Sequence, residues 1–145
     1  MIHSKQSYKK TLDELEEIRR YKSRIELGLQ PLLAEQKITP ESIEEILSEY
    51  TQREAVIEKD IADYKLALAG VGPKSSSLED FGRSLVLLRI AKGVSQEELA
   101  KRMGYAITMV SRDEGRDYKG ATLRRAKKVL VELGVPAMCT ITPKD

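Results

Sequence analysis

The sequence predicts an all-α protein, with an N-terminal antiparallel helical hairpin resembling a coiled coil and a C-terminal bundle of short helices. Glycine (9) and proline (5) are few among the 145 residues and gather at a few places, which favours helices with short joints. Residues 43–68 repeat apolar side chains at alternating spacings of four and three, as a coiled-coil seam does. After residue 77, short helical patterns alternate with glycines and capping residues.

The first helix is expected over residues 5–28. Its apolar stripe consists of Tyr8, Leu12, Leu15, Ile18, Ile25 and Leu29. Gly28 and Pro31 weaken the end of this helix, so the chain is expected to turn over residues 30–39. The next helix is expected to start with Thr39 as N-cap and Pro40 in the first position.

The second helix carries the heptad-like seam. The seam consists of Ile43, Leu47, Tyr50, Ile57, Ile61, Tyr64 and Leu68, with Glu54 in the one polar slot. Because two helices bury little apolar surface, a second copy is expected to complete the core, and these seven residues are predicted to mediate homodimerisation. The alternative is a hairpin that packs on its own C-terminal domain in a monomer. Residues 1–69 are thus the predicted hairpin, and the Gly-, Pro- and Ser-rich residues 70–77 the predicted flexible linker.

Four helices are expected in the domain spanning residues 78–134. Their expected ranges are 78–92, 96–103, 107–113 and 122–133. Ser95 and Glu98 form a capping-box pattern at the second of these helices, and Gly104 ends it. A capped short helix, a tight turn and another short helix predict a helix-turn-helix, which exposes one face of the later helix at a width that fits the DNA major groove. Residues 135–145 form a tail, in which Met138 to Ile141 could add a strand or pack on a neighbour.

The run Val94-Ser95-Gln96-Glu97-Glu98-Leu99-Ala100, followed by Gly104, Val110-Ser111-Arg112 and Glu114, resembles the Xre-type, lambda-repressor-like (Cro/CI-type) helix-turn-helix family. The resemblance covers residues 78–134 and implies a regulator of transcription, expected to be a repressor, that binds double-stranded DNA as a homodimer. The whole chain is also similar to a subgroup with a helical N-terminal extension, which is antitoxin-like. That similarity implies an alternative function: an antitoxin that binds a toxin protein through its N-terminal helices and represses the operon they share.

The resemblance assigns roles to individual residues. The implied base-reading residues are Ala106, Ile107, Thr108, Ser111 and Arg112. The implied phosphate contacts are Gln96, Arg116 and Lys119, and Arg89 with Glu114 is the implied structural ion pair. Arg112 suits the O6 and N7 atoms of guanine, and Ile107 either packs on a thymine methyl group or is partly buried. Asp113 departs from the family pattern and is expected to face away from DNA or to pair with Arg116 or Arg83. The charged residues Arg124, Arg125, Lys127 and Lys128 are interpreted as a solvated helix face.

Charge and composition bear on the class of partner. Residues 1–74 carry 12 Lys/Arg and 14 Asp/Glu, a net −2, and residues 75–145 carry 13 and 9, a net +4, so a polyanion partner is expected on the C-terminal half. The single cysteine and single histidine argue against a metal site and histidine-based catalysis. Since the sequence also has no phosphate-binding loop and no nucleophile–base pair, no enzyme and no cofactor are predicted. A cytoplasmic, nucleoid-associated protein that does not enter a membrane is expected.

Overall fold

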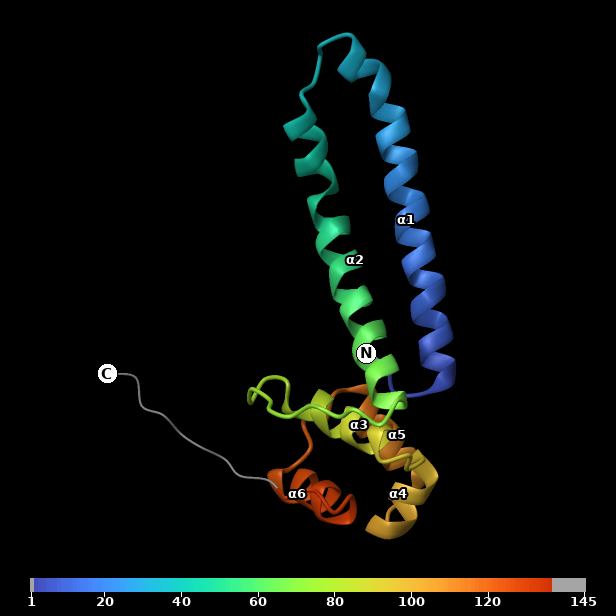
Figure 1. The fold of residues 1–145 in the computed structure, drawn as a ribbon, viewed down its shortest axis with the longest axis vertical. Coiled ribbons are helices and arrows are strands. Elements are labelled where there is room, and N and C mark those ends of the chain that lie inside the picture. The colour runs from blue at the N-terminus through green and yellow to red at the C-terminus, as the bar shows by residue number, and fades with distance from the viewer. Residues whose placement is uncertain (1, 137–145) are drawn as a thin grey trace, which may run out of the picture. The chain divides into compact units, whose positions relative to one another are not determined.

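The computed structural model describes residues 2–136, which contain six helices and no strand. The prediction of an all-α chain is therefore confirmed for this range. The helices are α1 (Lys5–Ala34), α2 (Pro40–Leu68), α3 (Phe81–Ala91), α4 (Gln96–Met103), α5 (Ile107–Gly115) and α6 (Leu123–Glu132) (Figure 1). The chain divides into two compact units, Ile2–Asp63 and the residues from Tyr64 onward, here called the N-terminal and C-terminal units. The expected tail contribution of Met138 to Ile141 lies outside the described residues.

Helix α1 is longer than predicted. It starts with a capping box, in which the Ser4 hydroxyl accepts from the Ser7 backbone N–H at 3.1 Å and the Ser7 hydroxyl accepts from the Ser4 N–H at 2.9 Å. The predicted end at residue 28 is wrong, because the helix continues through Gly28 and Pro31 to Ala34. Gln36 adopts a left-handed conformation (φ 55), and the backbone N–H of Lys37 donates to the carbonyl oxygen of Leu32 at 2.9 Å. This capping arrangement ends the helix six residues after the predicted end at residue 28.

Helix α2 starts as predicted, since the Thr39 hydroxyl accepts from the Ser42 backbone N–H at 3.3 Å and Pro40 is the first helical residue. The two long helices lie side by side and run antiparallel in the N-terminal unit (Figure 1). Their side-chain contacts follow that order along the chain: Arg53 binds Glu14, and the ring of Tyr50 lies 5.3 Å from that of Tyr21.

The core of the C-terminal unit is formed by apolar side chains from all four short helices. Those buried most completely are Leu85, Val86, Leu99, Met103, Val110 and Val129. Leu99 and Met103 lie one turn apart on α4, so one face of this helix packs inward while its polar residues face outward. The predicted ranges of the four helices agree with the observed ones to within a few residues, and that of α4 agrees at both ends.

A close backbone approach fixes the turn between α5 and α6 against the start of α3. Gly82 is buried in α3, and a Cβ atom built there would overlap the carbonyl oxygen of Asp117 and lie 2.5 Å from its carbonyl carbon. Asp117 and Tyr118 both adopt left-handed conformations, with φ of 52 and 55. Only glycine leaves room for this turn, which orients the C-terminal end of α5.

Candidate nucleic-acid interface

Helices α4 and α5 are joined by a tight turn at Gly104, Tyr105 and Ala106. The Ser95 hydroxyl caps α4 by accepting from the Glu98 backbone N–H at 3.0 Å, and Gly104 ends the helix in a left-handed conformation (φ 67). The backbone N–H of Tyr105 donates to the carbonyl oxygen of Ala100 at 2.9 Å, which closes the turn. Because Val110 is buried against the core, the opposite face of α5 is left toward solvent.

Five of the predicted contact residues surround one shallow hollow on this surface. Its lining consists of Gln96, Ile107, Thr108, Ser111 and Arg112. Thr108 and Arg112 are exposed, Ser111 is half-buried and Ile107 keeps 46% of its surface exposed. Ala106 is exposed as the N-cap of α5, directly before this group. The hollow therefore combines a guanidinium, two hydroxyls and a branched apolar side chain in a small area.

A buried ion pair holds α5 to α3 behind the hollow. Arg89 donates from Nε to Glu114 Oε1 at 2.5 Å and from Nη2 to Glu114 Oε2 at 2.8 Å, and its Nη1 donates to the carbonyl oxygen of Val94 at 2.7 Å. The Glu114 side chain is fully buried and that of Arg89 is 5% exposed. Two parallel bonds between a guanidinium and a carboxylate fix both angle and distance, so this contact sets the position of the C-terminal end of α5.

Gln96 lies at the edge of the hollow and is also part of the buried network. Its Nε2 donates to Glu114 Oε2 at 2.8 Å. The side-chain amide therefore has a partner inside the domain in addition to its place beside Ser111 and Arg112. A polar side chain held in one orientation costs less entropy on contact with a ligand than a mobile one.

Asp113 on α5 has a partner that the sequence did not reveal. Arg125 on α6 donates from Nη1 to both carboxylate oxygens of Asp113, at 3.2 and 2.9 Å. The possible partners of Asp113 expected from the sequence, Arg116 and Arg83, do not include Arg125. The interpretation of Arg125 as part of a solvated face is wrong, since its side chain is 29% exposed and joins α6 to α5. Asp113 thus places less uncompensated negative charge near the hollow than its sequence position suggests.

The segment between α5 and α6 carries the remaining predicted phosphate contacts. Arg116 is exposed at the C-cap of α5 and Lys119 is exposed three residues later. Between them, Tyr118 is buried, and burial together with the nearby Glu114 carboxylate raises the pKa of its phenol well above the ordinary value. Tyr118 therefore anchors the turn as a neutral core residue, while Arg116 and Lys119 project cationic groups from it.

The predicted dimerisation residues lie mainly inside the hairpin of one chain. Leu47, Ile57 and Ile61 are buried, as are Leu15 and Ile18 on α1. Ile43 and Tyr50 are half-buried, Tyr64 is buried and Leu68 is 58% exposed at the end of α2. The packing of α1 on α2 accounts for the burial of Leu47, Ile57 and Ile61, and a homodimer contact through the seam stays a prediction.

Protein-family models, curated proteins and solved structures were compared with this chain, and none of the three searches gave a match. No helix among residues 2–136 combines the length and apolar character needed to cross a membrane. Within the same range, His, Cys, Asp and Glu side chains do not gather into a group that could hold a metal ion.

Proposed function

We propose that the C-terminal unit is a helix-turn-helix domain of the lambda-repressor-like kind that binds duplex DNA and thereby regulates transcription. The proposal is carried by one observation: Gln96, Ile107, Thr108, Ser111 and Arg112 surround a single hollow on the exposed face of α5. An α-helix that presents such a face fits the major groove, where guanidinium and hydroxyl groups pair with base edges and apolar groups contact the thymine methyl.

The surroundings of the hollow support a role in DNA binding. Arg116 and Lys119 extend from the turn after α5, where cationic groups can follow the phosphate backbone. Asp113 is neutralised by Arg125, and Glu114 by Arg89, so the acidic residues of α5 do not oppose a polyanion as bare charges. In this proposal Arg112 reads a guanine, and nucleoid association and repression follow from occupancy of an operator.

Replacing Arg112 with Ala is expected to remove the preference for a specific operator. Loss of a bidentate contact to guanine costs about 1–3 kcal/mol of discrimination, and the phosphate contacts that remain preserve weak, salt-sensitive binding. Fluorescence anisotropy with the best operator and with a scrambled duplex of the same length measures both affinities. Lys119→Ala is the contrasting variant, because loss of a phosphate contact weakens both duplexes equally and lowers the salt slope by about 1. An operator preference unchanged in Arg112→Ala contradicts the assignment of α5 as the reading helix.

A further inference from the structure

Several apolar side chains lie along one face of the N-terminal hairpin and are exposed. Tyr21 and Leu32 on α1 are 46% and 37% exposed, and Ile46 on α2 is 49% exposed. Tyr21 packs against the half-buried ring of Tyr50, so α1 and α2 both contribute to this face. We call these four residues the apolar face. Single exposed apolar residues are ordinary on a protein surface, whereas several on one face of two neighbouring helices favour an interaction site.

Ion pairs join the two helices on both sides of the hairpin, and they are denser on the side opposite the apolar face. Glu14 lies seven residues before Tyr21, and Arg53 lies seven residues after Ile46, so each lies on the same helical stripe as its apolar neighbour. The bond from Arg53 to Glu14 therefore joins the two helices on the same face as Tyr21 and Ile46, about two turns along each helix from them. On the other side, Arg19 and Lys22 both bind Glu54 at 2.7 Å. The charged side chains Arg19, Lys22 and Glu54 on the polar side of the hairpin therefore find their partners within one chain. The helices of the same hairpin leave the apolar face exposed.

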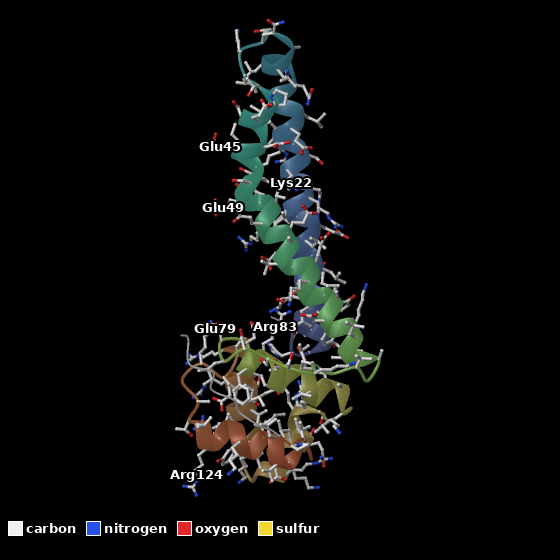
Figure 2. All side chains as sticks on the ribbon, turned by 60° about the vertical axis from the view of Figure 1, so that its left-hand side comes forward. Lys22, Glu45, Glu49, Glu79, Arg83 and Arg124 are labelled. Atoms are coloured by element: carbon white, nitrogen blue, oxygen red, sulfur yellow. The ribbon has the colours of Figure 1, made fainter. Side chains whose placement is uncertain are left out.

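The outer edges of the apolar face carry opposite charges. Arg24 follows Tyr21 by three residues on α1, and Glu49 follows Ile46 by three residues on α2, and both are exposed. Figure 2 shows Glu49 with Glu45 on the side of α2 that points away from α1. Because the rings of Tyr21 and Tyr50 are in contact, Arg24 and Glu49 lie at nearly the same height, within about 3 Å along the helix axes. One edge is basic and the other acidic at a single level of the hairpin.

We propose that the apolar face binds the apolar face of a second copy of this chain, with the two hairpins parallel in a four-helix bundle. A two-fold axis that runs along the hairpins, in the plane of contact, brings α1 of each copy opposite α2 of the other at the same height. Arg24 of each copy then faces Glu49 of the other, at both edges of the contact. An axis across the hairpins would instead bring α1 against α1 and Arg24 toward Arg24, which is repulsive.

The parallel arrangement has a consequence for the C-terminal units. Both α2 helices end at the same end of the bundle, so both C-terminal units continue from that end. Two C-terminal units tethered to one end of the bundle can bind two half-sites of one duplex. The dimer does not depend on DNA binding and is measured without DNA. A failure of the proposed dimer contact can therefore be distinguished from a failure of the proposed DNA binding.

Sedimentation velocity of the full chain over a micromolar concentration series tests the proposed face. We expect the wild-type chain to form dimers of twice 16.3 kDa. Ile46→Glu, Arg24→Glu and Glu49→Lys should each raise the dimer Kd at least about tenfold, the first by burying a charge and the others by placing like charges together. The double variant Arg24→Glu, Glu49→Lys restores the opposite pairing and should recover the dimer to within about threefold of the wild-type Kd.

Glu44→Lys is the matched control, because Glu44 is also exposed on α2 but lies five residues before Glu49, on the polar side of the hairpin. We expect this variant to dimerise as the wild type does. Circular dichroism confirms that each variant keeps its helices, and the charge swap tests the contact even if Ile46→Glu disturbs the hairpin. A wild-type chain that stays monomeric, or a double variant as weak as the single ones, overturns the proposal.

Discussion

Replacing Glu114 with Gln is expected to lower the free energy of unfolding of the C-terminal unit by about 3 kcal/mol or more, because removal of one member of a buried ion pair leaves the other charge uncompensated. The carboxylate of Glu114 accepts from Arg89 and from Gln96, and both ions of the pair are buried. Urea unfolding followed by circular dichroism measures the change, and hydrogen exchange of the α3 amides assigns it to this unit.

Glu98→Gln is the matched control for Glu114→Gln. Glu98 bonds Arg102 at 2.8 Å, so the distance resembles that of the buried pair, but its side chain is 45% exposed. An exposed pair contributes about 0.2–1 kcal/mol, and the control should lose no more than that. Equal losses in the two variants would show that burial of the Arg89–Glu114 pair does not matter to stability.

Replacing Gly82 with Ala is expected to destabilise the C-terminal unit by about 3 kcal/mol, at the upper end of the cost of overpacking a core. The added methyl group would overlap the carbonyl oxygen of Asp117, and this is backbone in a tight turn rather than the end of a movable side chain. Alanine is the better helix former by about 1 kcal/mol, so a loss of stability here runs against helix propensity. Urea unfolding measures the change in the free energy of unfolding of Gly82→Ala.

Gly28→Ala separates the steric effect from propensity. Gly28 also lies inside a helix, but a Cβ built there has nothing within 4 Å. This variant should gain up to about 1 kcal/mol of stability in the N-terminal unit. A Gly82→Ala variant that is as stable as the wild type would show that the turn at Asp117 and Tyr118 moves aside without cost.

The elements predicted best are those specified by neighbouring residues. The Ser95 cap, the polar face of α4 and Gly104 are all within ten residues of one another, and the range of α4 is predicted correctly. The end of α1 is predicted wrongly because the stop is a left-handed Gln36, a residue type that seldom marks a helix end. A proline inside the last turn is tolerated there, which the sequence rule for helix interiors does not convey.

In the candidate site, too, the features specified by neighbouring residues are predicted better than those that depend on distant ones. Its surface residues follow from their spacing on one short helix, whereas the partners beneath it come from distant parts of the chain. Gln96 reaches Glu114, and Arg125 reaches Asp113, across separations of 18 and 12 residues. A charge run on a helix resembles a solvated face whether or not one member turns inward, so the role of Arg125 was missed. A glycine inside a short helix, as at Gly82, is a signal for a close approach that could have been used.

The hairpin illustrates a limit of periodicity. A seam of apolar residues shows that a helix has a covered side, but it does not say which helix covers it. In this chain Leu47, Ile57 and Ile61 of the seam are buried within the hairpin, whereas Leu68 of the same seam is 58% exposed and Ile46, beside the seam, is 49% exposed. A contact with another chain is therefore sought among the side chains left exposed and not along the seam as a whole.

Selection of bound sequences from a pool of random duplexes, with the purified full chain, tests the central claim of DNA binding most directly. We expect enrichment of a site with two half-sites about one helical turn, ~34 Å, apart, each with a guanine at the position that Arg112 reads. Affinity for that site should exceed affinity for a scrambled duplex and should fall linearly on a logarithmic salt scale. A pool that yields no enriched sequence, with no salt-dependent binding to any duplex, would contradict the account.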